Sequence, residues 1–83
     1  MTVNEFIVFV FDKEKSVGRK TQVWRVHAIR NLALLGTIKW LGRWRQYTFY
    51  PEGDTIFNAG CLREIADKAE ELSKDHRAKE RDG

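Results

Sequence analysis

The chain is poor in the residues that mark several large classes of protein: its 83 residues include one cysteine, one proline and six glycines. A single cysteine cannot form an internal disulfide, and no metal-ligand spacing of cysteine and histidine accompanies it. The sequence therefore excludes a disulfide scaffold and a zinc ribbon. The scarcity of proline and glycine excludes collagen-like fibres. We expect a protein of the reducing cytoplasm that holds no metal and no other cofactor.

Long apolar runs are also missing. The longest, from Phe6 to Phe11, has six residues, whereas a membrane-spanning helix needs about 20. No basic region precedes it and no small-residue cleavage site follows, so we expect neither a signal peptide nor a membrane partner. A chain this short buries only about 60% of its unfolded surface, which predicts one domain over residues 1–83 without a deep cleft between lobes.

The net charge of +3 hides an asymmetry along the chain. Residues 13–45 carry nine basic side chains and one acid, Glu14, whereas residues 51–83 carry nine acids and six bases. Such a division predicts one positive surface, built from the first half of the chain, and one surface of mixed charge.

The apolar patterning predicts four strands. Residues 6–11 are β-branched and aromatic throughout, which favours a strand with both faces covered. Residues 22–29, 36–40 and 45–50 alternate between apolar and polar side chains, as half-buried strands do. Gly42 lies between the last two segments and predicts a hairpin, which Pro51 ends because proline cannot donate to a ladder. We expect residues 12–20 to form a loop.

A helix is predicted after Asn58, which is a favourable N-cap. Phe57 and Leu62 are spaced as a hydrophobic staple, and the helix is expected to fray over residues 77–83, where no apolar stripe continues. The predicted fold class is α+β, a small antiparallel sheet of three to four strands packed against one C-terminal amphipathic helix. The expected core contains Trp24, Val26, Ile38, Trp40, Tyr47 and Phe49 from the sheet and Leu62, Ile65, Ala69 and Leu72 from the helix.

Conventional catalytic residues are few. Cys61 is expected at the third helical position beside the apolar stripe, and His27 has no aspartate or asparagine partner that the sequence can place. His76 is expected on the solvated face near the end of the helix. Glu52 and Asp54 lack a third ligand nearby and favour a turn around Gly53. The sequence therefore predicts no catalytic residue, no metal site and a protein that is not an enzyme.

Residues 39–47, KWLGRWRQY, interleave three basic side chains with two indoles and a phenol around the predicted hairpin tip. Such a surface can neutralise phosphates and stack on bases, and a narrow antiparallel sheet can also enter the major groove of DNA. We therefore predict a small accessory protein that binds nucleic acid through a basic sheet face and hairpin tip. The predicted contact residues are Arg25, Lys39, Arg43, Trp44 and Arg45.

Two alternatives remain open. In the first, the aromatic residues of this segment belong to the core, and the arginines are only solvent-exposed charges on the outer face. Alternatively, Trp44 between two arginines has the composition of a protein-binding hot spot. The strand from Phe6 to Phe11, if it lies at the sheet edge, can also pair with a second subunit to form a homodimer. The alternative function is thus a protein-interaction module that acts on a host or mobile-element protein.

Two stretches carry a resemblance, residues 35–51 with the sequence WRQY inside them, and residues 55–65 with the pattern Cys61-Leu62-x-x-Ile65. Together they resemble small proteins of phages, prophages and other mobile elements for which no activity is established, so the resemblance implies a context rather than a chemistry. The predicted order of three strands followed by a helix also resembles the sheet-plus-helix DNA-binding domains of some phage and transposon integrases. The N-terminal strand and the acidic helix depart from that pattern.

Overall fold

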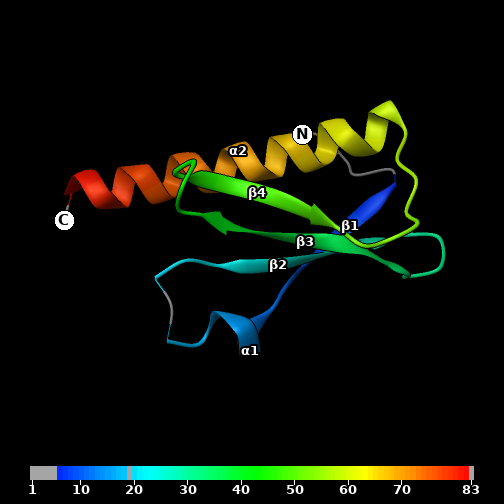
Figure 1. Ribbon diagram of the computed structural model, residues 1–83, viewed down its shortest axis with the longest axis horizontal. Helices are drawn as coiled ribbons and strands as arrows, with labels where there is room; N and C mark the ends of the chain where they lie inside the picture. Colours follow the sequence, from blue (N-terminus) through cyan, green and yellow to red (C-terminus); the bar gives the residue numbers. More distant parts are fainter. Residues whose placement is uncertain (1–5, 19, 83) are drawn as a thin grey trace.

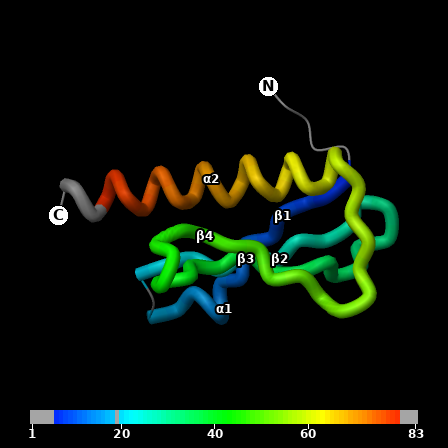
Figure 2. The backbone as a smooth tube through the Cα atoms, turned by 45° about the horizontal axis from the view of Figure 1, so that its top comes forward, coloured from blue at the N-terminus to red at the C-terminus, as the bar shows by residue number. Residues whose placement is uncertain are grey.

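The computed structural model describes residues 6–18 and 20–82. Its four strands, β1 (Ile7–Phe11), β2 (Val23–Ala28), β3 (Leu34–Leu41) and β4 (Gln46–Pro51), form one antiparallel sheet in the order β1-β2-β3-β4. The long helix α2 (Ala59–Asp82) covers one face, and the short helix α1 (Lys13–Ser16) lies on the opposite side (Figures 1 and 2). The predicted α+β fold class, an antiparallel sheet packed against a C-terminal helix, is confirmed.

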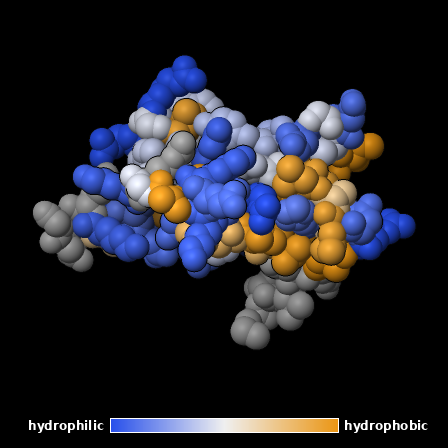
Figure 3. Space-filling model, turned by 90° about the horizontal axis from the view of Figure 1, so that it is seen from below, coloured by the Kyte–Doolittle hydropathy of each residue, from blue (hydrophilic) through white to orange (hydrophobic). Residues whose placement is uncertain are grey.

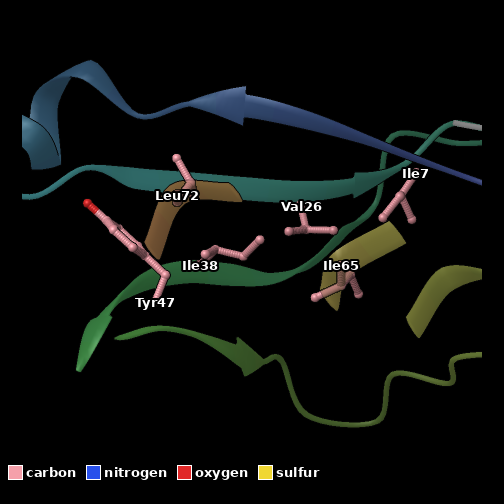
Figure 4. Packing of buried hydrophobic residues seen from close by; sticks show 6 residues of the cluster. All are labelled: Ile7, Val26, Ile38, Tyr47, Ile65 and Leu72. Carbon is pink, nitrogen blue, oxygen red and sulfur yellow. The ribbon is translucent and has the colours of Figure 1, made fainter. Parts of the chain in front are cut away.

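The core fills the space between α2 and the sheet, because alternate strand residues point toward the helix. Its buried members are Ile7, Val26, Ile38, Tyr47, Ile65 and Leu72 (Figure 4). Trp24, Trp40, Phe49 and Phe57 are partly buried against this cluster. The rings of Trp40 and Tyr47 meet edge to face with centroids 5.4 Å apart, and those of Phe49 and Phe57 do the same at 5.4 Å. The predicted strand contribution to the core is therefore correct.

The helix differs from the sequence prediction in its phase and its length. Leu62 is 51% exposed and lies outside the core, because the face toward the sheet runs through Cys61, Ile65, Ala69 and Leu72. Phe57, the first residue of the predicted staple, packs on Phe49 of β4. The helix also continues to Asp82, where fraying was expected. Residues 77–81 are alanine, lysine, glutamate and arginine, all strong helix formers that need no apolar stripe.

Strand β1 is an edge strand that pairs only with β2 among the described strands. Ile7 is fully buried toward α2, whereas Val8 and Val10 lie on the opposite face and are only partly buried. The predicted strand is therefore confirmed, but its face away from α2 is covered only in part.

The segment expected to be a loop contains α1, which is capped at its N-terminal end. Asp12 Oδ1 accepts a hydrogen bond from the Lys15 N–H at 3.0 Å, as an N-cap does. The Ser16 hydroxyl donates to the Asp12 carbonyl at 2.7 Å and accepts from the Val23 N–H at 3.0 Å. Through these bonds α1 is held against β2 on the side away from α2.

Candidate nucleic-acid interface

The face of the sheet opposite α2, here called the open face, carries the charged residues of the strands. Its members are Val8, Val10, Val23, Arg25, His27, Thr37, Lys39, Leu41, Gln46, Thr48 and Tyr50. Arg25 and Lys39 are the only Lys, Arg, Asp or Glu residues in the four strands, and both are exposed here. Figure 3 looks onto this side of the molecule and shows hydrophilic side chains over its middle. The open face is thus positive, as the charge asymmetry predicts.

The strand register brings the two cations and one aromatic ring together. Arg25 lies opposite Thr37, and Val23 lies opposite Lys39, so Arg25 and Lys39 are diagonal neighbours on β2 and β3. Thr37 in turn lies opposite Tyr50 of β4, and the Lys39 Nζ is 4.4 Å from the centroid of the Tyr50 ring. This contact is a cation–π interaction that holds the ring beside the ammonium group.

His27 adds a further polar group two residues along β2 from Arg25. Its Nδ1 lies 2.9 Å from the carbonyl oxygen of Leu32, and since a carbonyl oxygen only accepts, Nδ1 carries the proton. The bond fixes the imidazole against the turn between β2 and β3. His27 therefore lies on the same face as Arg25, as the alternation predicts.

The hairpin tip at residues 42–45 carries the other three predicted contact residues. The Trp44 N–H donates to the Leu41 carbonyl and the Arg45 N–H to the Gly42 carbonyl, each at 3.2 Å. Trp44 is 57% exposed, and Arg43 and Arg45 are exposed as well. The structure thus places these three residues together at one end of the sheet that carries Arg25 and Lys39.

The backbone of Arg45 has a φ of +54°, in the left-handed region that favours glycine or asparagine. An L side chain in this conformation costs about 1 kcal/mol. On the helix side, the Arg77 guanidinium donates to the Arg45 carbonyl at 3.1 Å and ties the tip to α2. An arginine therefore stands at a turn position where a glycine would be less strained.

The aromatic residues near the tip divide between the core and the surface. Trp40 and Tyr47 belong to the helix side, as one alternative from the sequence had it, whereas Trp44 is exposed. His76 was expected on the solvated face, but it is half-buried with its ring centroid 4.3 Å from that of Trp40. That prediction is wrong because His76 follows Leu72 by four residues and so lies on the face of α2 that is turned toward the sheet.

Two features of the open side were missed by the sequence analysis. Tyr50 was placed only at the end of a strand, although the alternation that turns Tyr47 and Phe49 inward also turns Tyr50 outward. The helix α1 brings exposed Lys13 and Lys15 to the side of the sheet away from α2. Asp12 followed by a charged, helix-forming segment was the signal that could have identified it.

Nucleophile and base candidates do not meet. Cys61 is partly buried on α2 against the core, while His27 lies on the other face of the sheet. His76 is 15 residues further along α2 than Cys61, about 22 Å at the rise of a helix. A groove of about 550 Å³ between α2 and β4 is lined by Gln46, Tyr47, Ala66, Ala69, Glu70, Ser73, Lys74 and Arg77, and by no cysteine or histidine.

Within residues 6–18 and 20–82, no three His, Cys, Asp or Glu side chains converge as a metal site would require. The helices of the same residues include none with the length and apolar character needed to cross a membrane. Comparison of the chain with protein-family models, with curated proteins and with solved structures found no match. The resemblances to mobile-element proteins and integrase domains therefore stay predictions.

Proposed function

We propose that this protein is a non-enzymatic accessory protein that binds nucleic acid through its open face and hairpin tip. The observation that carries the proposal is the placement of Arg25 and Lys39, the only charged side chains of the strands, side by side on the face that α2 leaves uncovered. Arg43, Trp44 and Arg45 add two exposed cations and an exposed indole at the tip of the β3–β4 hairpin.

The four cations set the expected salt dependence. Each phosphate neutralised contributes about 0.9 to the slope of log affinity against log salt on duplex DNA, and about 0.7 on a single strand. Four contacts therefore predict a slope of about −3 to −4. Between about 50 and 200 mM salt, such a slope weakens binding by about 50- to 150-fold.

The test is fluorescence anisotropy of labelled DNA and RNA oligonucleotides, titrated with the protein at several salt concentrations. Arg25→Ala and Lys39→Ala should each lower the magnitude of the slope by about 1 and weaken binding to all sequences alike. Arg63→Ala is the matched control, because Arg63 is exposed on α2 and lies on the side turned away from the sheet. Absence of binding at low salt, or an equal loss in the Arg63 variant, would overturn the proposal.

A second candidate function is association with another protein, for which we propose a second copy of this chain. The outer edge of β4 is poorly suited to pair with a further strand, because the Tyr47 N–H already donates to Ser73 Oγ and Pro51 has no N–H. Strand β1 is the opposite edge, and it contains no proline and no charge. Phe11, at its end, is 42% exposed. Antiparallel pairing of two β1 strands about Phe9 would cover Phe11 of both copies.

An apolar end of the molecule adjoins this edge. The β2–β3 turn and the β4–α2 loop lie side by side there (Figures 1 and 2), and hydrophobic side chains gather over that end in Figure 3. The exposed members are Phe6, Ile29, Leu32, Leu34, Ile56 and Leu62.

Sedimentation equilibrium tests self-association. The expected mass is about twice the 9.8 kDa of the chain. Phe11→Lys should restore the monomer, whereas Lys74→Ala, a change at an exposed position beside β4 at the opposite edge of the sheet, should not. A wild-type protein that sediments as a monomer at high concentration would rule this candidate out.

A further inference from the structure

We infer that the nucleic acid recognised by the open face is single-stranded, with bases stacked on Tyr50 and Trp44 and phosphates held by Arg25, Lys39 and the arginines of the tip. The inference rests on the proposed nucleic-acid binding and narrows its substrate class. It follows from the shape of the surface and from the aromatic rings that the fold leaves on it.

The open face is too wide to enter a duplex groove. Neighbouring strands lie about 4.8 Å apart, so four backbones span about 14 Å before side chains are added. The major groove of B-DNA is about 12 Å wide and admits one helix or a two-stranded ribbon. The molecule as a whole measures 28 and 23 Å along its two shorter principal axes. The open face can therefore reach the bases of a duplex only if they are unpaired.

The β3–β4 hairpin cannot act as a free ribbon either. Its tip is bonded to α2 by the hydrogen bond from Arg77 to the Arg45 carbonyl. Just behind the tip, Trp40 packs on His76, and the Tyr47 N–H donates to Ser73 Oγ. A ribbon entering the major groove would carry α2 into the phosphate backbone, so the hairpin is not free to read base edges from within the groove.

A positive sheet face with one half-buried aromatic ring on it and an exposed indole at the hairpin tip instead fits unpaired bases. Stacking on an aromatic side chain requires only the π-face that every base has, and the cations beside it follow the phosphates. Tyr50 is half-buried on the open face with Lys39 over its ring, and Trp44 is 57% exposed. From Tyr50 to Gln46 the strand β4 covers about 13 Å, so Tyr50 and the hairpin tip that carries Trp44 are separated by the length of a few nucleotides.

The deciding experiment compares labelled oligo-dT and oligo-U of about 20 nucleotides, a length that covers the site of a typical single-strand binder, with a duplex of the same length. We expect the single strands to bind at least about 10-fold more tightly than the duplex at equal salt. Comparison of the affinities for oligo-dT and oligo-U shows whether the protein prefers single-stranded DNA or RNA. Quenching of tryptophan fluorescence should accompany binding and be lost in Trp44→Phe if the indole stacks on a base.

The variants separate stacking from charge. Tyr50→Leu should weaken single-strand binding about 10-fold, because one stacked base contributes about 1–3 kcal/mol, and Tyr50→Phe should restore it. The salt slope should be the same in both, since neither removes a cation. Circular dichroism of Tyr50→Leu establishes that the variant is folded.

Three outcomes are decisive. Equal or tighter binding of the duplex overturns the single-strand inference but leaves nucleic-acid binding intact. Tyr50→Leu binding as the wild type overturns the stacking platform in the same way. Failure to bind any of the three oligonucleotides at low salt overturns the proposed function itself.

Discussion

Ser73 joins α2 to the edge of the sheet, and its replacement by alanine tests the packing that ties the two together. Ser73 is 6% exposed, and its hydroxyl accepts from the Tyr47 N–H at 2.9 Å while donating to the Ala69 carbonyl at 2.8 Å. Tyr47 is itself 5% exposed. Ser73→Ala therefore leaves a buried backbone donor without its partner.

Two effects of opposite sign determine how much Ser73→Ala changes the free energy of unfolding. An unsatisfied buried N–H costs about 1–3 kcal/mol. Alanine has a higher helix propensity than serine, which stabilises α2 by up to about 0.5 kcal/mol. We expect a net loss of about 1–2 kcal/mol in the free energy of unfolding. For a domain of this size, that corresponds to a fall of about 5–15 °C in melting temperature.

The assay is equilibrium urea unfolding followed by tryptophan fluorescence. Lys74→Ala is the matched control: it changes the next residue of the same helix, which is exposed, and should stay within about 0.5 kcal/mol of the wild type. The Tyr47 amide should also exchange faster with deuterium in Ser73→Ala. A Ser73→Ala protein as stable as the wild type, or more stable, would refute the reasoning, because helix propensity alone would then account for the result.

Three further predictions concern the backbone. Gly36→Ala should destabilise the protein by about 3 kcal/mol, measured by urea unfolding, because the added Cβ would lie 2.6 Å from the Tyr50 carbonyl oxygen; an unchanged midpoint would contradict this close approach. Asn58→Ala should cost about 1 kcal/mol by removing the cap whose Oδ1 accepts from the Cys61 N–H at 2.8 Å, and a Gly variant at this position should recover most of the loss. Arg45→Gly should raise the melting temperature by relieving about 0.5–1 kcal/mol of left-handed backbone strain, and it should weaken nucleic-acid binding. If the melting temperature falls together with the affinity, the arginine side chain is needed for the turn.

Part of the candidate site could be predicted from the sequence because strands alternate. Once Trp24 and Val26 are assigned to the core, Arg25 must point to the other face of the sheet. The same alternation places Lys39 on that face, because its neighbours Ile38 and Trp40 point to the core. The exposure of Trp44 could not be predicted in this way. It depends on the turn geometry at residues 42–45, which places this indole outside while Trp40, four residues earlier, packs on α2.

The errors concern features that tertiary contacts decide. Leu62 has helical spacing with the core residues, yet the orientation of α2 against β4 leaves it exposed, since a small rotation moves the margin of an apolar stripe into solvent. The strand β1 is apolar at every position, and composition alone does not distinguish an edge strand from a central one, so this alternative stayed open until the structure placed β1 at the edge. His76 is polar and was assigned to the solvent, but an imidazole also packs well against an indole.

The sequence by itself determined the class of the fold, the order and approximate bounds of the main elements, and the face of each strand that carries charge. These depend on local periodicity and on capping residues, which act over a few neighbours in the chain. The tertiary structure alone decided the register that makes Arg25, Lys39 and Tyr50 neighbours on three strands. It also decided the placement of α2 over the other face and the bonds that tie the hairpin tip to the helix. Such contacts join residues distant in the chain, and their energies depend on the packing of the whole core, which no local pattern records.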